Sequence, residues 1–132
     1  MNIIDPDHPD SEELRKLFQR LRGGAVSAFA AAEFAMGDLL AAMERSGRFP
    51  DTRFYYHVEK RLSQFKKVCL KHSGPSDIKV IEYVTSGFQA TIGDRNALAH
   101  GFATLFVEER KVEVIKFSPS KELGNHATNL HL

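Results

Sequence analysis

Apolar residues recur every three or four positions over the first third of the chain. They fall at positions 14, 18, 21, 25, 28, 32, 36, 39 and 43, which is the spacing of one face of an α-helix. Asp10 followed by Glu13 is typical of a capping box at a helix start, and Gly47 with Pro50 indicates a helix end. The pattern therefore predicts a helix over residues 11–46.

Two further helices are predicted downstream, and the first helix has one weak point. Gly23 and Gly24 lie inside its pattern, where their low helix propensity allows a kink or a break into two helices. Apolar residues then recur at helical steps over residues 52–71 and again over residues 76–100. Gly101 follows at the position of a left-handed C-cap, which indicates where the third helix ends.

The chain changes to a strand pattern after the third predicted helix. β-Branched and aromatic residues on both sides of the polar turn 108–111 predict a β-hairpin over residues 103–117. Residues 1–9 are expected to form a loose arm, and residues 118–132 a short helix or a weakly ordered tail. The predicted fold class is mostly α, an antiparallel bundle of three long helices followed by a C-terminal β-hairpin, within one domain of residues 1–132.

Composition and charge narrow the classes of function. The chain of 132 residues is 42% hydrophobic and 27% charged, which favours a folded domain over a disordered one. Its net charge of +1 excludes binding of a polyanion through bulk charge, so a nucleic-acid contact would need a local patch. The acidic, proline-bearing start is not typical of a signal peptide, and we expect a cytoplasmic protein.

A membrane span, a disulfide and a metal site are each disfavoured by particular residues. The most apolar window, residues 25–43, contains Glu33 and Asp38, whose burial in hydrocarbon would be costly, so we expect a packed helix and no membrane contact. Cys69 is the single cysteine, which excludes an intrachain disulfide, and its apolar neighbours favour a buried thiol. The sequence has no cluster spaced like metal ligands, and we expect no cofactor.

The residues with the most chemistry lie at the end of the third predicted helix. Arg95 is spaced by sevens from Ile81 and Phe88 and continues their face, so its permanent charge needs a carboxylate, a phosphate or another chain. Asn96 and His100 are four residues apart and share a neighbouring face, toward which the long arginine arm can reach. The cluster offers a fixed cation, an amide and an imidazole that titrates near neutral pH.

A purely structural interpretation of the same residues is also open. Arg95 would then pair with an acid such as Glu33, and Asn96 would be an ordinary bridging amide. His100 would lie over the last carbonyl groups of its own helix, where a cation is favoured. Chemistry alone does not decide between the two interpretations.

The segment Arg95-Asn96-Ala97-Leu98-Ala99-His100 resembles the signature of the HEPN superfamily, which is an arginine, a polar residue, three further positions and a histidine. The resemblance implies a helical homodimer in which two motifs meet, and in many members a metal-independent endoribonuclease, often within a toxin–antitoxin pair. It implies that Arg95 binds the scissile phosphate, His100 is the general acid or base and Asn96 orients them. Other members are inactive dimerisation, RNA-binding or partner-binding modules. Phe102 stands where one toxin-like subgroup has a tyrosine.

The second predicted helix is locally basic. Lys60, Arg61, Lys66 and Lys67 are candidate RNA-binding residues, because lysine and arginine neutralise the phosphates of a nucleic-acid backbone. The same charges are also typical of a solvated helix face that keeps a protein soluble. The leading hypothesis is therefore a metal-independent ribonuclease, and the alternative is an inactive dimerisation or binding module of the same fold. A third hypothesis is an unrelated three-helix interaction domain in which Arg95 is only a buried ion-pair residue.

Overall fold

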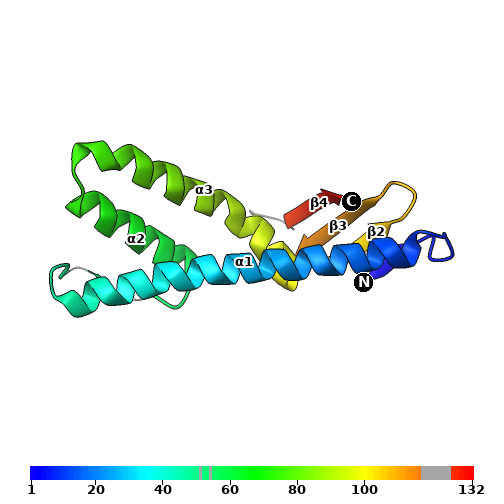
Figure 1. Ribbon diagram of the computed structural model, residues 1–132, viewed down its shortest axis with the longest axis horizontal. Coiled ribbons are helices and arrows are strands. Elements are labelled where there is room, and N and C mark those ends of the chain that lie inside the picture. Colours follow the sequence, from blue (N-terminus) through cyan, green and yellow to red (C-terminus); the bar gives the residue numbers. More distant parts are fainter. Residues whose placement is uncertain (51, 54, 117–125) are drawn as a thin grey trace. The chain divides into compact units, whose positions relative to one another are not determined.

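The computed structural model describes residues 1–50, 52–53, 55–116 and 126–132 (Figure 1). Most of them are helical, which confirms the mostly α class and the three predicted helices. The elements in chain order are β1 (Asn2–Ile4), α1 (Ser11–Ser46), α2 (Val58–His72), α3 (Pro75–His100), β2 (Phe102–Phe106), β3 (Lys111–Lys116) and β4 (His126–His131).

The bounds predicted for the first helix are confirmed, because α1 begins at Ser11 and ends at Ser46. At its start, the Asp10 carbonyl accepts a hydrogen bond from the Leu14 amide at 2.9 Å, which places Asp10 at the N-cap. At its end, Gly47 has a φ of 67°, the left-handed conformation that terminates many helices. α1 is continuous through Gly23 and Gly24, so the break allowed by the sequence does not occur.

Replacing Gly23 or Gly24 of α1 by alanine is expected to stabilise the protein. A Cβ atom added at Gly23 or Gly24 would meet no heavy atom within 4 Å, so alanine fits without a clash. Alanine lowers the entropy of the unfolded chain, and each substitution should add about 0.5–1 kcal/mol to the free energy of unfolding. Urea denaturation measures this gain. Gly47→Ala is the control and should lower stability because of its positive φ, and a loss at Gly23 or Gly24 would contradict the account.

The second and third helices differ slightly from their predicted ranges. α2 begins at Val58, so the start expected at residue 52 is wrong. His57 has an extended backbone and serves as the N-cap, so Tyr55 and Tyr56 lie before the helix. α3 begins at Pro75, one residue before its predicted start, since proline is well suited to the first position of a helix.

The chain divides into two compact units, residues 1–28 with 93–132 and residues 29–92. In residues 29–92, side chains from all three helices form one core, and Figure 1 shows α2 beside α3. Met36, Leu40, Leu62 and Ile92 are buried in this core, and Met43, Val58, Phe65 and Phe88 pack against it. The other unit contains the start of α1, the end of α3 and all four strands.

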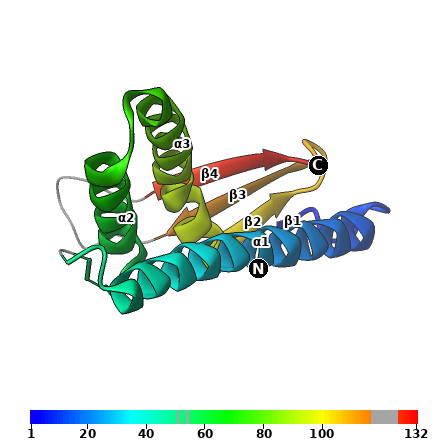
Figure 2. The ribbon, with the colours of Figure 1, turned by 60° about the vertical axis from the view of Figure 1, so that its left-hand side comes forward.

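The strands form one sheet in the order β1-β2-β3-β4, as Figure 2 shows. β2 and β3 are antiparallel, with Phe102 opposite Ile115 and Phe106 opposite Lys111, so the predicted hairpin is confirmed. The sheet nevertheless has four strands and is larger than a hairpin. The expectation of a loose arm over residues 1–9 is wrong, because β1 pairs in parallel with β2. β4 pairs antiparallel with β3, which corrects the weakly ordered tail over His126–His131. Residues 117–125, which the predictions also covered, lie outside the described residues.

The two faces of the sheet differ in burial. Ala103 and Leu105 of β2 are buried and alternate with exposed or half-buried neighbours, as do Val112 and Val114 of β3; Val107, directly after β2, is also buried. Helix residues of the same unit are buried with them, namely Leu14, Phe18, Ala97 and Leu98. One face of the sheet therefore belongs to the core of its unit, and the opposite face is more exposed.

α1 is, within the described part of the chain, the single helix that is long and apolar enough to cross a membrane by length and composition. Core helices of soluble proteins and signal sequences meet the same criterion. Glu33, which lies within α1, is 9% exposed in the unit of residues 29–92.

Candidate functional site

The motif Arg95–His100 forms the last turns of α3. Ala97 and Leu98 are buried in the core of their unit, which fixes the rotation of the helix about its axis. Arg95 and Asn96 are consequently half-buried, and His100 is exposed at the end of the helix. The amphipathic pattern thus places the three predicted site residues at or near the surface.

A hydrogen bond joins the first two residues of the motif. Nη1 of Arg95 donates to Oδ1 of Asn96 at 2.6 Å. Asn96 and His100 are one helical turn apart, and Arg95 and His100 start from positions about 140° apart around the axis. The bond therefore holds the guanidinium at Asn96, one helical turn before His100, and the reach of Arg95 to the imidazole stays a prediction.

The carbonyl groups at the end of α3 are bound by an arginine that sequence analysis did not single out. Nε of Arg22, on α1, donates to the Leu98 carbonyl at 2.6 Å, and its Nη2 donates to the Gly101 carbonyl at 3.2 Å. Helix-terminal carbonyls carry partial negative charge, so a guanidinium is well suited to cap them. Arg22 occupies the place that the structural interpretation gave to His100.

The imidazole of His100 is exposed. No hydrogen bond or ion pair within the described residues involves this side chain. An exposed imidazole near neutral pH can accept or donate a proton, which is what acid–base catalysis requires. Its predicted role as a helix cap is not observed, and the catalytic role stays a prediction.

Gly101 links the motif to the sheet through a close approach. Its amide donates to the Ala97 carbonyl at 2.6 Å, which closes the last turn of α3. A Cβ added here would lie 2.7 Å from Cγ1 of Val114 and 3.1 Å from the Ile115 carbonyl oxygen. The left-handed cap predicted at Gly101 is wrong, because the positive φ among the described glycines is at Gly47. The position requires glycine for space.

The C-terminal strand is attached directly beside the motif. Oγ1 of Thr128, on β4, donates to Oδ1 of Asp94 at 2.7 Å, and Asp94 precedes Arg95 in α3. Sequence analysis expected a loose tail here and therefore missed the contact. No local signal indicates it, because 34 residues separate the two partners.

The four candidate RNA-binding residues lie on α2, in the unit of residues 29–92. Lys60 and Lys67 are exposed and line the same shallow hollow, whereas Lys66 lines a different one. Arg61 is half-buried. The role of these four residues in RNA binding stays a prediction. The predicted pairing of Arg95 with Glu33 stays a prediction.

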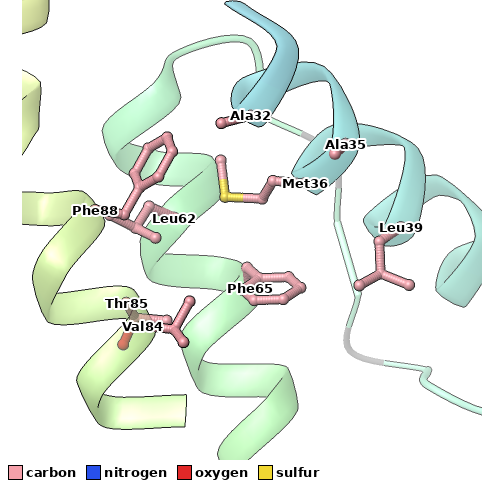
Figure 3. Close-up of a pocket in the computed structure, with 9 residues that line it drawn as sticks. All are labelled: Ala32, Ala35, Met36, Leu39, Leu62, Phe65, Val84, Thr85 and Phe88. Atoms are coloured by element: carbon pink, nitrogen blue, oxygen red, sulfur yellow. The ribbon is translucent and has the colours of Figure 1, made fainter. Parts of the chain in front are cut away.

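An apolar groove of about 350 Å³ opens between the three helices of residues 29–92. Figure 3 shows Leu62 and Phe65 of α2 between a wall from α1 and a wall from α3. Thr85 supplies the single hydroxyl among the nine lining residues, and its Oγ1 donates to the Ile81 carbonyl at 2.7 Å. The groove thus offers almost no polar group to a substrate and is unsuited to acid–base chemistry.

The remaining nucleophile and metal-ligand candidates add no second centre. Cys69 is half-buried, and burial raises the pKa of its thiol, which disfavours the reactive thiolate. Within the described residues, no group of three or more histidine, cysteine, aspartate or glutamate side chains could hold a metal ion. The end of α3 is therefore the arrangement with the most chemical capability.

Comparison of the chain with family models, curated proteins and solved structures gives no match.

Proposed function

We propose that the end of α3 is the active site of a metal-independent endoribonuclease of the HEPN type. The observation that carries the proposal is the bond between Arg95 and Asn96, which holds a guanidinium at a residue one helical turn before the exposed His100. A guanidinium matches phosphate geometry through paired donors, and an imidazole transfers protons near neutral pH. RNA is a substrate that needs both groups at once.

The proposed reaction uses the 2′-hydroxyl of the RNA as its nucleophile. The imidazole of His100 accepts the hydroxyl proton while the 2′-oxygen forms a bond to the adjacent phosphorus. The bond from phosphorus to the 5′-oxygen breaks, and a protonated imidazole supplies the proton that this leaving oxygen takes. Arg95 binds the non-bridging oxygens, where negative charge accumulates in the transition state. The products carry a 2′,3′-cyclic phosphate and a 5′-hydroxyl.

A homodimer in the cytoplasm is part of this proposal. One imidazole acts as the base and a second must act as the acid, so two copies of His100 would supply both functions. The proposal also includes an antiparallel arrangement of the three helices. For α2 and α3 this arrangement is favoured by the two-residue connection Ser73-Gly74, because short connections join antiparallel neighbours. Each copy would then present the end of α3 to its partner.

The proposal is tested by incubating the purified chain with mixed-sequence RNA in EDTA. The wild type should cleave the RNA, because none of the proposed steps requires a metal. Arg95→Ala should lower the cleavage rate about 10²- to 10³-fold, as expected when a donor to developing charge is removed. Arg95→Lys keeps the charge without the paired donors and should be intermediate. Unchanged cleavage by Arg95→Ala, with circular dichroism showing intact helices, would refute the assignment.

A second candidate function is an inactive dimerisation or partner-binding module of the same fold. It is supported by large apolar side chains on the exposed face of the sheet, where Phe102 is 63% exposed and lies opposite the exposed Ile115. Exposed apolar patches of this kind often contact a partner. The same RNA assay separates the two candidates, because a module would remain dimeric and leave the RNA intact.

A further inference from the structure

A shallow hollow on the unit of residues 29–92 has a polar lining quite different from the apolar groove. Its volume is about 340 Å³, and it lies beside α2 near the start of that helix. The lining residues are Tyr55, Lys60, Ser63, Gln64 and Lys67. Four of the five lie on one face of α2, because Ser63, Gln64 and Lys67 follow Lys60 by three, four and seven residues.

Every lining residue of this hollow can donate a hydrogen bond. Tyr55 and Ser63 have hydroxyl groups, Gln64 has an amide, and Lys60 and Lys67 have ammonium groups. Among the described residues, none that lines the hollow is acidic, so these five side chains bring positive charge and no carboxylate. A site built from donors and cations is complementary to an oxyanion.

Electrostatics at the start of α2 add to this complementarity. Lys60 lies in the first turn of α2, where the helix dipole favours an anion. The N-cap residue His57 makes no side-chain hydrogen bond to the first turn. Lys60 and Lys67 line the same hollow two helical turns apart, so an anion bound between them would be attracted by both charges.

We propose that this hollow binds the phosphate of an anionic ligand, through Lys60 and Lys67 with hydrogen bonds from Tyr55 and Ser63. A phosphate has enough oxygens to accept several of these donors at once. RNA and small phosphorylated compounds both carry this chemistry. The proposal is independent of cleavage at the end of α3, since it concerns binding by other residues.

The test compares two double variants of the full chain that remove the same charge. Lys60→Gln with Lys67→Gln removes both cations of the hollow. Lys66→Gln with Lys79→Gln is the matched control, because Lys66 lines a different hollow and Lys79 lies on α3. The probes are inorganic pyrophosphate and a 2′-O-methyl oligouridylate, which resists attack by its own 2′-oxygen. Calorimetry gives each dissociation constant, and circular dichroism checks folding.

The hollow variant is expected to bind its ligand at least tenfold more weakly than the wild type, since it lacks two charge-assisted hydrogen bonds. The control variant should stay within about twofold of the wild type. A loss confined to the oligouridylate identifies the RNA backbone as the source of the phosphate, and a loss confined to pyrophosphate identifies a small compound. Absence of binding of both probes to the wild type, or an equal loss in the control, would overturn the proposal.

Discussion

His100→Ala is expected to lower the rate of RNA cleavage by about 10²- to 10⁴-fold, the usual contribution of a positioned acid–base group. The imidazole is the proton acceptor of the proposed reaction, and an alanine methyl cannot replace it. The substitution should leave the fold intact, because the side chain is exposed and Arg22 caps the helix end instead. Single-turnover cleavage of a labelled RNA in EDTA measures the loss.

The matched control for this prediction is another exposed histidine of the same unit. His131 lies on β4, and His131→Ala should cleave RNA at the wild-type rate. An equal loss in both variants would indicate a general effect of removing histidines. Wild-type activity in a folded His100→Ala protein would exclude the imidazole from the reaction.

Gly101→Ala is expected to lower the free energy of unfolding by about 3 kcal/mol, at the upper end of the range for overpacking. The added methyl would overlap the Ala97 carbonyl oxygen and crowd Cγ1 of Val114 and the Ile115 carbonyl. Two of these three neighbours are backbone atoms, which cannot rotate away as a side chain can. Urea denaturation measures the loss.

A helical glycine without close neighbours provides the comparison for this prediction. A Cβ at Gly87 would meet no heavy atom within 4 Å, so Gly87→Ala should raise stability by about 0.5–1 kcal/mol. The two substitutions add the same methyl group, and only their surroundings differ. If Gly101→Ala were as stable as the wild type, the close approach between α3 and β3 would be wrong.

The helices could be predicted from sequence because their signals are local. The bounds of α1 follow from apolar spacing and from Gly47, all within the helix or next to it. The start of α3 was placed to within one residue by its proline. The predicted start of α2 at residue 52 was wrong. The apolar spacing around Tyr55 and Tyr56 fits a helix and a preceding loop equally well.

The two outer strands could not be predicted because they depend on distant pairing. β1 has three residues, and its partner Thr104 lies about a hundred positions away from Asn2. β4 has a weak alternation in which Thr128 and Leu130 lie opposite Val114 and Val112. Such short segments form strands because the free edges of the β2–β3 hairpin present backbone groups to which they can hydrogen-bond.

The candidate site was located from sequence, but its supporting contacts were not. Arg95, Asn96 and His100 belong to one helix, so their spacing fixed which of them share a face. Arg22 binds the helix end from 76 residues away, which no local pattern reveals. Sequence analysis correctly predicted that position 101 needs glycine, but for the wrong reason. Glycine is needed because a Cβ atom would collide with its neighbours, and not because of a positive φ.

The most direct measurement of the central claim compares two RNA oligonucleotides that differ by one oxygen, in EDTA. One is all-RNA, and the other has a 2′-deoxynucleotide on the 5′ side of the bond that the wild type cuts. The account predicts rapid cleavage of the first at that bond, with a 2′,3′-cyclic phosphate end, and none of the second. Equal cleavage of both, or no cleavage of the all-RNA strand, would contradict it.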